Sequence, residues 1–247
     1  MLKEVKHLYL GRKTPRREER FSPHCGACVA PLRMTFREVL ILFFLLSSFF
    51  ITSCASPNQP APQQVISAYS TSSAGPWMDE LFTCANDLSI AVNVTAEEPE
   101  IYLRIGEPEN LLTPAYQIDE EEILVVVHGE SLVQNLSLEE VQALFAGEGD
   151  GLTQVWVYPS ELDLFGVFEQ AVMQGRGVTS LAKVALDPQQ MSDVLNSESA
   201  AIGILPRHWK AGNVRDVYSL GEFPVLAMTR EEPQGAVALL LACLQRN

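Results

Sequence analysis

The chain has 247 residues, of which 17 are basic and 31 acidic, and its formal net charge is −14. A surface this acidic repels the phosphates of nucleic acids, so nucleic acid is excluded as a partner. The sequence contains no nucleophile elbow, no His/Asp/Glu set at metal-ligand spacing and no glycine-rich phosphate loop. We therefore expect neither an enzyme nor a protein that holds a metal or another cofactor.

Residues 1–33 are basic, and their hydrophobic pattern has neither helical nor strand periodicity. They are longer than the positively charged start of an ordinary signal peptide, so we expect Met34 to be the true start and 1–33 to be an extended or non-native leader. Cys25 and Cys28 form a lone CxxC pair, which supplies only two of the four ligands of a zinc site. We interpret this pair as incidental.

Residues 34–53 are predicted to form a signal peptide. Val39–Ile51 is an uncharged run of thirteen residues that follows basic residues. A membrane-spanning helix needs about 20 apolar residues. Ile51–Cys54 resembles a bacterial lipobox, in which two small residues let a peptidase reach the bond before Cys54, and the Cys54 thiol then carries a lipid. The alternative is a short anchor helix that ends in a cysteine.

Cleavage before Cys54 would leave 194 residues, enough for one large domain or two small lobes. Nine basic and four acidic residues lie before Cys54, so the remainder has 8 basic and 27 acidic residues and a net charge of −19. We expect this part outside the cytoplasm, lipid-anchored to the outer face of the cell membrane behind a Pro-rich linker at 54–64. Its other cysteines, Cys84 and Cys243, either form a disulfide in this oxidising compartment or stay buried free thiols.

Val65–Tyr69 is predicted to be a strand, and a loop rich in hydroxyl side chains follows it. Trp77–Asp87 has apolar residues at helical spacing and predicts a helix. A loop that joins a strand to a helix start directs its N–H groups and hydroxyls at whatever lies above the helix N-terminus. Ordinary N-capping of the helix is the alternative, and the loop alone favours it.

The middle of the chain contains one buried strand and one well-capped helix. Ile123–Val127 is a continuous aliphatic run, typical of a strand buried on both faces of a parallel sheet. The acidic run Asp119–Glu122 before it is interpreted as a solvated turn. Ser137 and Glu140 form a capping box that begins a short amphipathic helix, and Gly147 ends this helix.

Basic residues are rare after Cys54. Arg104, in a predicted strand at Glu100–Ile105, is the only one before Arg176. The Arg207–Lys210 cluster is interpreted as an exposed loop, with a place at the edge of a cleft as the alternative. The remaining predicted strands are 89–94, 155–158, 201–206, 216–220 and 223–228, with 184–186 as a short strand or an approach to the next helix. The remaining predicted helices are 163–173, 189–195 and 234–245.

Three stretches of the sequence occur in an order that is typical of one protein family. Asn135–Gly147 reads Asn-Leu-Ser-Leu-Glu-Glu-Val-x-x-Leu-Phe-x-Gly, and it follows a strand that ends in Val-Val-Val-His. Ser70-Thr71-Ser72 is similar to that family's first ligand loop, and Ala201–Pro206 is similar to the strand that returns to its first lobe. From about residue 65 to the C-terminus, the chain thus resembles the phosphate-type substrate-binding lipoproteins of ABC importers.

The resemblance implies an α/β fold of the type 2 periplasmic-binding-protein kind. Two lobes would be joined by two crossover strands, with a ligand cleft between them. One lobe would comprise 65–127 and 206–247, and the other 128–205. The ligand would lie on Ser70, Thr71, Ser72, Arg104 and Ser160.

The second ligand loop departs from the family pattern. The family has Ser-Gly-Thr after a strand, whereas this chain has Pro-Ser-Glu-Leu-Asp at 159–163, and only Ser160 matches. Glu161 and Asp163 stand where donors should contact an oxyanion, and like charges at such range repel strongly. This lobe therefore binds a different ligand, binds weakly or has lost binding, unless both carboxylates are solvated at a helix start.

We expect a monomeric extracytoplasmic solute-binding protein of an ABC transporter, which holds a small ligand such as a phosphate-like oxyanion in the cleft and delivers it to permease subunits. The alternative is a degenerate binding-protein-like lipoprotein that acts as a non-transport envelope interaction or sensing module. The net charge and the acidic second loop favour the alternative. The order of the motifs and the hydroxyl-rich loop favour the receptor.

Overall fold

The computed structural model describes residues 64–149 and 151–246, which belong to one compact unit that begins at Pro60. The predictions for the leader 1–33, the signal peptide, Cys54 and the linker up to residue 63 lie outside the described residues. No helix within the described ranges is long and apolar enough to cross a membrane.

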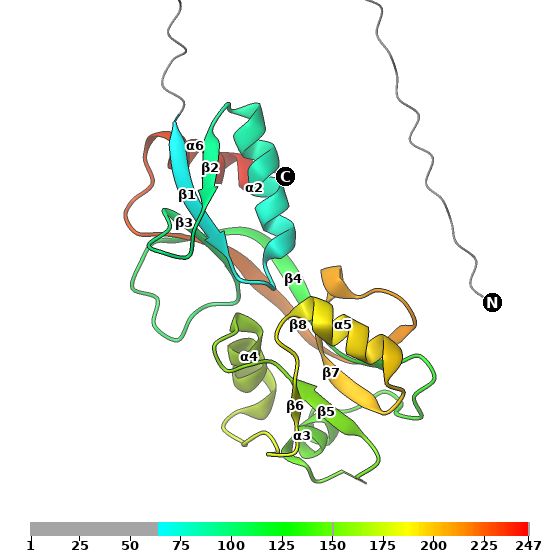
Figure 1. The fold of residues 1–247 in the computed structure, drawn as a ribbon. Helices are drawn as coiled ribbons and strands as arrows, with labels where there is room; N and C mark the ends of the chain where they lie inside the picture. Colours follow the sequence, from blue (N-terminus) through cyan, green and yellow to red (C-terminus); the bar gives the residue numbers. More distant parts are fainter. Residues whose placement is uncertain (1–63, 150, 247) are drawn as a thin grey trace, which may run out of the picture. The chain divides into compact units, whose positions relative to one another are not determined.

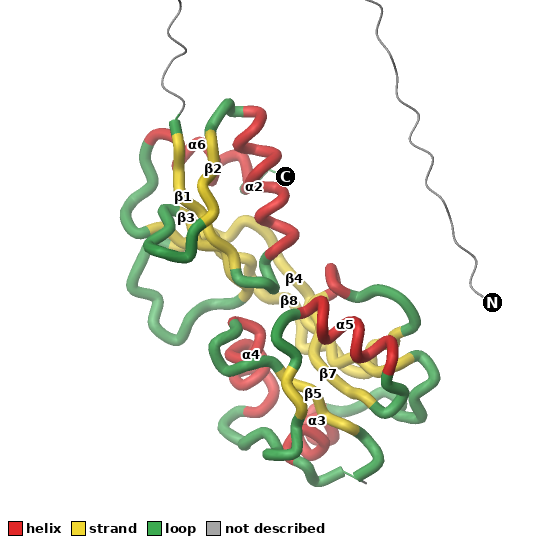
Figure 2. The backbone as a smooth tube through the Cα atoms, in the orientation of Figure 1, coloured by secondary structure: helices red, strands yellow, loops and turns green. Residues whose placement is uncertain are grey.

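The described strands form one mixed sheet in the order β2-β1-β3-β8-β4-β7-β5-β6 (Figures 1 and 2). Pairs among β1, β2 and β3 and among β5, β6 and β7 are parallel, while β8 and β4 pair antiparallel with their neighbours. The strands are β1 (Val65–Ser70), β2 (Ala91–Val94), β3 (Ile101–Ile105), β4 (Ala115–His128), β5 (Gln154–Val157), β6 (Lys183–Val184), β7 (Ala201–Pro206) and β8 (Val214–Thr229). The helices are α2 (Gly75–Asp87), α3 (Leu138–Ala146), α4 (Asp163–Phe168), η2 (Glu169–Met173), α5 (Pro188–Ser197), η3 (Arg207–Trp209) and α6 (Gly235–Leu244).

Two long strands, β4 and β8, run through the middle of the sheet and pair along their length. We call β1–β3 with α2 and α6 the first half, and β5–β7 with α3, α4, η2 and α5 the second half (Figure 1). Since β4 and β8 extend into both halves, they are the two strands that cross between them. The predicted lobe bounds stay a prediction, because the long strands belong to both halves.

The centre of β4 is a deeply buried strand segment. Ile123–Val127 is almost completely buried, as predicted, but its neighbours β7 and β8 run antiparallel to it. The interpretation of Asp119–Glu122 as a turn is wrong, because these residues lie within β4 and pair with β8. Asp119 and Glu120 are exposed, as expected, whereas Glu121 is buried. The predicted strands 216–220 and 223–228 are one strand, in which Gly221, with φ 103°, lies where the pairing register shifts. Glycine adopts the positive φ of this bulge without strain. In the sequence, the same glycine looks like a break between two strands.

The capped helix and the disulfide are both present. Ser137 Oγ accepts from the Glu140 N–H at 3.3 Å, and Glu140 accepts from the Ser137 N–H at 2.7 Å, which confirms the capping box. Gly147, with φ 87°, ends this helix, α3. Cys84 of α2 is bonded to Cys243 of α6, with the two Cα atoms 6.0 Å apart. The structure therefore contains the bridge and excludes the alternative of two free thiols.

Candidate functional site

The loop between β1 and α2 is fixed by its own hydrogen bonds. The Thr71 N–H donates to the Leu103 carbonyl of β3 at 3.0 Å, and the Ala74 N–H donates to Thr71 Oγ1 at 3.3 Å. Thr71 and Ser73 are buried, whereas Ser72 between them is exposed. The loop thus presents two alternate hydroxyls to the interior of the protein.

The group that meets these hydroxyls is the carboxylate of Asp163, at the start of α4 in the second half. Its Oδ2 accepts from Thr71 Oγ1 and from the Ile105 N–H, both at 2.8 Å. Its Oδ1 accepts from the Ser73 hydroxyl and from the Leu164 N–H, the latter at 2.9 Å. We call these four donors, the Thr71 and Ser73 hydroxyls and the N–H groups of Ile105 and Leu164, the carboxylate cradle.

The cradle has no hydroxyl proton left for a further ligand. Thr71 Oγ1 and Ser73 Oγ lie 2.7 Å apart, and their two protons already serve the two contacts with Asp163. Asp163 is 6% exposed and Ser73 is fully buried. None of the ion pairs among the described residues includes Asp163, so hydrogen bonds compensate its buried charge. The site is therefore filled by an anion that belongs to the chain itself.

A close approach between β3 and α4 brings Asp163 to the cradle. Gly106 follows Ile105 with φ 74°, and its N–H donates to the Pro224 carbonyl at 2.8 Å. A Cβ atom at Gly106 would lie 2.5 Å from Cγ2 of Val167 in α4. Both the backbone conformation and the space therefore require glycine here.

Of the five residues predicted to bind ligand, only Thr71 belongs to the cradle. Ser72 and Ser160 are exposed, and Ser70 lies within β1. Arg104 precedes Ile105 on β3, and its Nε is buried without a hydrogen-bond partner among the described residues. The role of these five residues in ligand binding stays a prediction.

The sequence did not identify Ser73 as a site residue, and it did not predict that Asp163 is buried. The expectation of a solvated carboxylate fits Glu161, which is exposed, and is wrong for Asp163, which is buried among donors. Ser73 stands in the same hydroxyl-rich loop as Thr71, so the loop was found but the residue was not. If side chains alternate in direction along the loop, Thr71 and Ser73 point to the same side, and this alternation was the signal that could have identified Ser73. An irregular loop need not keep this alternation, so the signal is weak.

Two tyrosines on β1 and β3 lie near the cradle. Burial raises the pKa of Tyr102, the Asp163 carboxylate raises it further, and the Arg104 guanidinium lowers it. Tyr102 stacks on Tyr69 with ring centroids 5.9 Å apart and planes inclined by 7°. Both rings line a cavity of ≈ 400 Å³ in the first half.

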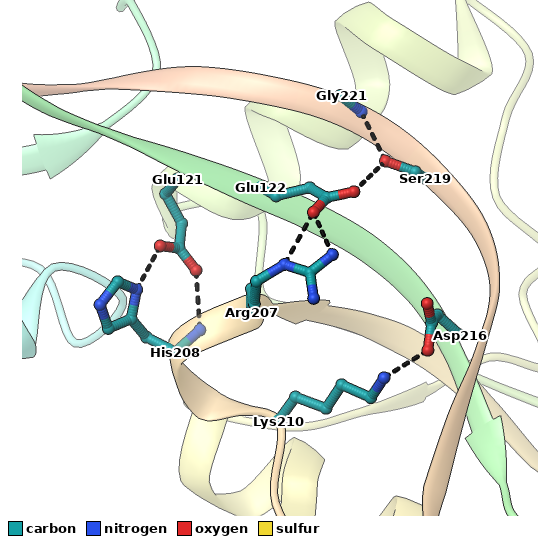
Figure 3. A network of polar contacts seen from close by, with 8 residues as sticks. All are labelled: Glu121, Glu122, Arg207, His208, Lys210, Asp216, Ser219 and Gly221. Atoms are coloured by element: carbon teal, nitrogen blue, oxygen red, sulfur yellow. Dashed lines mark hydrogen bonds and ion pairs between the residues drawn. The ribbon is translucent and has the colours of Figure 1, made fainter.

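A network of polar contacts lies where β4, β8 and η3 meet (Figure 3). Glu121, which is 2% exposed, accepts from the His208 N–H at 2.9 Å and also contacts Nδ1 of the His208 ring. Glu122 accepts from Arg207 Nε and from Ser219 Oγ, each at 2.7 Å. These hydrogen bonds, from Ser219 first and Arg207 second, lower the pKa of Glu122. Glu121 and Glu122 are therefore accommodated in a strand because donors from η3 and β8 satisfy them, while Asp119 and Glu120 are exposed.

The short helix η3 connects this network to the cradle loop. Trp209 Nε1 donates to the Ser73 carbonyl at 3.1 Å. The His208 ring packs edge-on against Trp77 of α2, with centroids 4.9 Å apart, and Trp77 Nε1 donates to Asp119 of β4 at 2.9 Å. Residues after β7 therefore help to hold the loop that carries Thr71 and Ser73.

Neither a family model nor a curated protein matches the sequence, but solved structures match the fold. A putative phosphate ABC transporter substrate-binding protein with bound phosphate from Clostridium perfringens is 13% identical, with a TM-score of 0.65 over 73% of this chain and 93% of that chain. An ABC-type phosphate transport receptor from Vibrio cholerae is 14% identical, with a TM-score of 0.58 over 74% and 93%. The reduced form of the regulatory domain of OxyR2 from Vibrio vulnificus is 9% identical, with a TM-score of 0.56 over 74% and 95%.

These likenesses establish the fold. The chain has the α/β periplasmic-binding-protein-like fold that the sequence predicts. Proteins described as transport receptors and as regulatory domains share it, so the fold does not decide between solute capture and another role.

Proposed function

We propose that the chain is a lipid-anchored extracytoplasmic protein with a binding-protein fold, which serves as an interaction or sensing module of the cell envelope and captures no free oxyanion in the cradle. The observation that carries this proposal is that Asp163 already uses all four donors. The support for a location outside the cytoplasm is sequence pattern: the predicted signal peptide, the lipobox-like residues that end at Cys54, and the Pro-rich stretch after them.

A free oxyanion meets two obstacles at the cradle. It has to displace Asp163 from four hydrogen bonds, or else lie beside a carboxylate. Two like charges 4 Å apart repel by about 4 kcal/mol at an effective dielectric constant of about 20. The net charge of −19 that remains after Cys54 also opposes the approach of anions. Both effects favour the envelope module over a phosphate receptor.

Thermal unfolding of residues 60–247 tests this function. We expect phosphate, sulfate and molybdate to leave the unfolding midpoint of the wild type unchanged, whereas a ligand at a hundred times its Kd would stabilise the protein by about 2.7 kcal/mol. Thr71→Val probes the cradle, and Ser72→Ala is the matched control with an exposed hydroxyl. A midpoint that rises with an oxyanion in the wild type and in Ser72→Ala, but not in Thr71→Val, would overturn the proposal.

One observation favours a second candidate, the solute receptor of an ABC importer with a permease partner. The cavity beside Tyr69 and Tyr102 has a volume of ≈ 400 Å³, within the range of about 300–1,000 Å³ that is usual for small-molecule sites. Its stacked rings offer an apolar face to a sugar or an aromatic amino acid. A rise of the unfolding midpoint with such a solute, lost in Tyr102→Ala, would favour the receptor.

A further inference from the structure

We propose that the cradle is a binding site for small monocarboxylates and that Asp163 is its tethered ligand. Free formate or acetate then occupies the cradle once the Asp163 side chain is shortened. This inference rests on the proposed function, in which the cradle captures no free oxyanion, and it names the chemical class that the cradle recognises instead.

The number and direction of the donors fit a carboxylate. Each oxygen of Asp163 accepts two hydrogen bonds, Oδ2 from Thr71 and Ile105, and Oδ1 from Ser73 and Leu164. An ionised carboxylate has about four acceptor positions on its two oxygens, so four donors satisfy it. A phosphate or sulfate brings two further oxygens and a larger charge. Among the described residues, no ion pair brings a cation to the bound carboxylate that could balance this charge.

Because Asp163 is tethered, we expect the wild type not to bind free acids. Thr71, Ser73 and Ile105 belong to the first half, whereas Asp163 begins α4 of the second half. The chain connection keeps the Asp163 carboxylate at a high effective concentration beside the three donors. A free acid cannot compete with it at ordinary concentrations. The same contact joins the two halves, as a bound solute would.

Two variants leave spaces of different sizes in the cradle. Asp163→Ala removes the carboxylate and keeps Cβ, so the vacated space has the size of formate. Asp163→Gly removes Cβ as well, so the space has the size of acetate. In both variants, buried hydroxyls and N–H groups lose their acceptor, which is unfavourable until an anion replaces it. Glu161→Ala is the matched control, because it removes an exposed carboxylate two residues away.

Thermal unfolding of residues 60–247, which contain the whole compact unit, measures the effect. We expect the midpoints of Asp163→Ala and Asp163→Gly to lie roughly 5–10 °C below that of the wild type, and that of Glu161→Ala within about 2 °C of it. Relative to chloride at equal ionic strength, formate should raise the midpoint of Asp163→Ala, and acetate that of Asp163→Gly, by about 3 °C or more. Neither acid should raise the midpoint of the wild type, or of either variant when Thr71→Val is added.

Three results would overturn the proposal: no rise with either acid in folded variants, an equal rise with sulfate, or a rise that persists when Thr71→Val is added. If Asp163→Ala and Asp163→Gly do not fold, Asp163→Asn tests the proposal instead. Its amide fills the space but places an NH2 group against the donors, so its midpoint should fall further than that of Glu161→Gln. A wild-type midpoint for Asp163→Asn would equally overturn the proposal. The variants report on the cradle, while the oxyanion panel on the wild type reports on the proposed function, so the two failures are distinguishable.

Discussion

Replacement of both Cys84 and Cys243 by alanine will lower the free energy of unfolding by about 2–5 kcal/mol. The bridge joins residues 159 apart in the sequence, and a cross-link that closes so long a loop removes conformational entropy from the unfolded chain. It also ties α2, which follows the cradle loop, to the last helix, α6. For a domain of this size, the midpoint of thermal unfolding should fall by roughly 5–15 °C.

Calorimetry of the oxidised wild type and the double variant measures this difference, and a reductant supplies the control. Reduction should lower the wild-type midpoint toward that of the double variant, and it should leave the double variant unchanged. The stabilising role of the bridge is contradicted if the double variant unfolds within about 1 °C of the oxidised wild type.

Trp77→Ala should lower the free energy of unfolding by about 3–5 kcal/mol. Trp77 is 1% exposed, and it packs in the core from the first turn of α2, which follows the loop that carries Thr71 and Ser73. Its ring also meets the His208 ring, so the substitution removes a contact between α2 and η3. The midpoint of urea denaturation at constant slope is the appropriate measurement, because it separates a loss of stability from a change in compactness.

Asp119→Ala separates the burial of the indole from its hydrogen bond. This variant removes the acceptor of the Trp77 N–H and leaves the ring packed, so we expect a loss of only about 1 kcal/mol. Equal losses in Asp119→Ala and Trp77→Ala would show that the hydrogen bond, and not the buried ring, provides the stability.

Local patterns predicted most of the elements because their causes are local. The capping box at Ser137 and Glu140 needs only residues three apart, and the aliphatic run at Ile123–Val127 fixes a buried strand by composition alone. Local patterns could not show that the Asp119–Glu122 run belongs to a strand. Its partners, Arg207 and His208, lie more than 80 residues further along the chain, and without them four successive acids resemble a solvated turn.

The sequence predicted the loop that forms the candidate site, but it did not predict that the Asp163 carboxylate occupies this site. The sequence identified the hydroxyls around Thr71 and noted that Asp163 was unfavourable for an oxyanion. It could not show that these two features compensate each other, because Thr71 and Asp163 are 92 residues apart and meet only through the close approach of β3 and α4. The carboxylate that argued against an oxyanion ligand is the group that accepts hydrogen bonds from these donors in the structure.

The most direct test of the occupied cradle is an NMR titration of residues 60–247 with phosphate, in which the N–H signals of Ile105 and Leu164 are followed. Both groups donate to Asp163, so any exchange of the bound anion changes their environment. We expect that neither signal moves in a saturable manner in the wild type. A saturable shift of both signals, with loss of their contact to Asp163, would show that a free oxyanion enters the cradle and would contradict the proposed function.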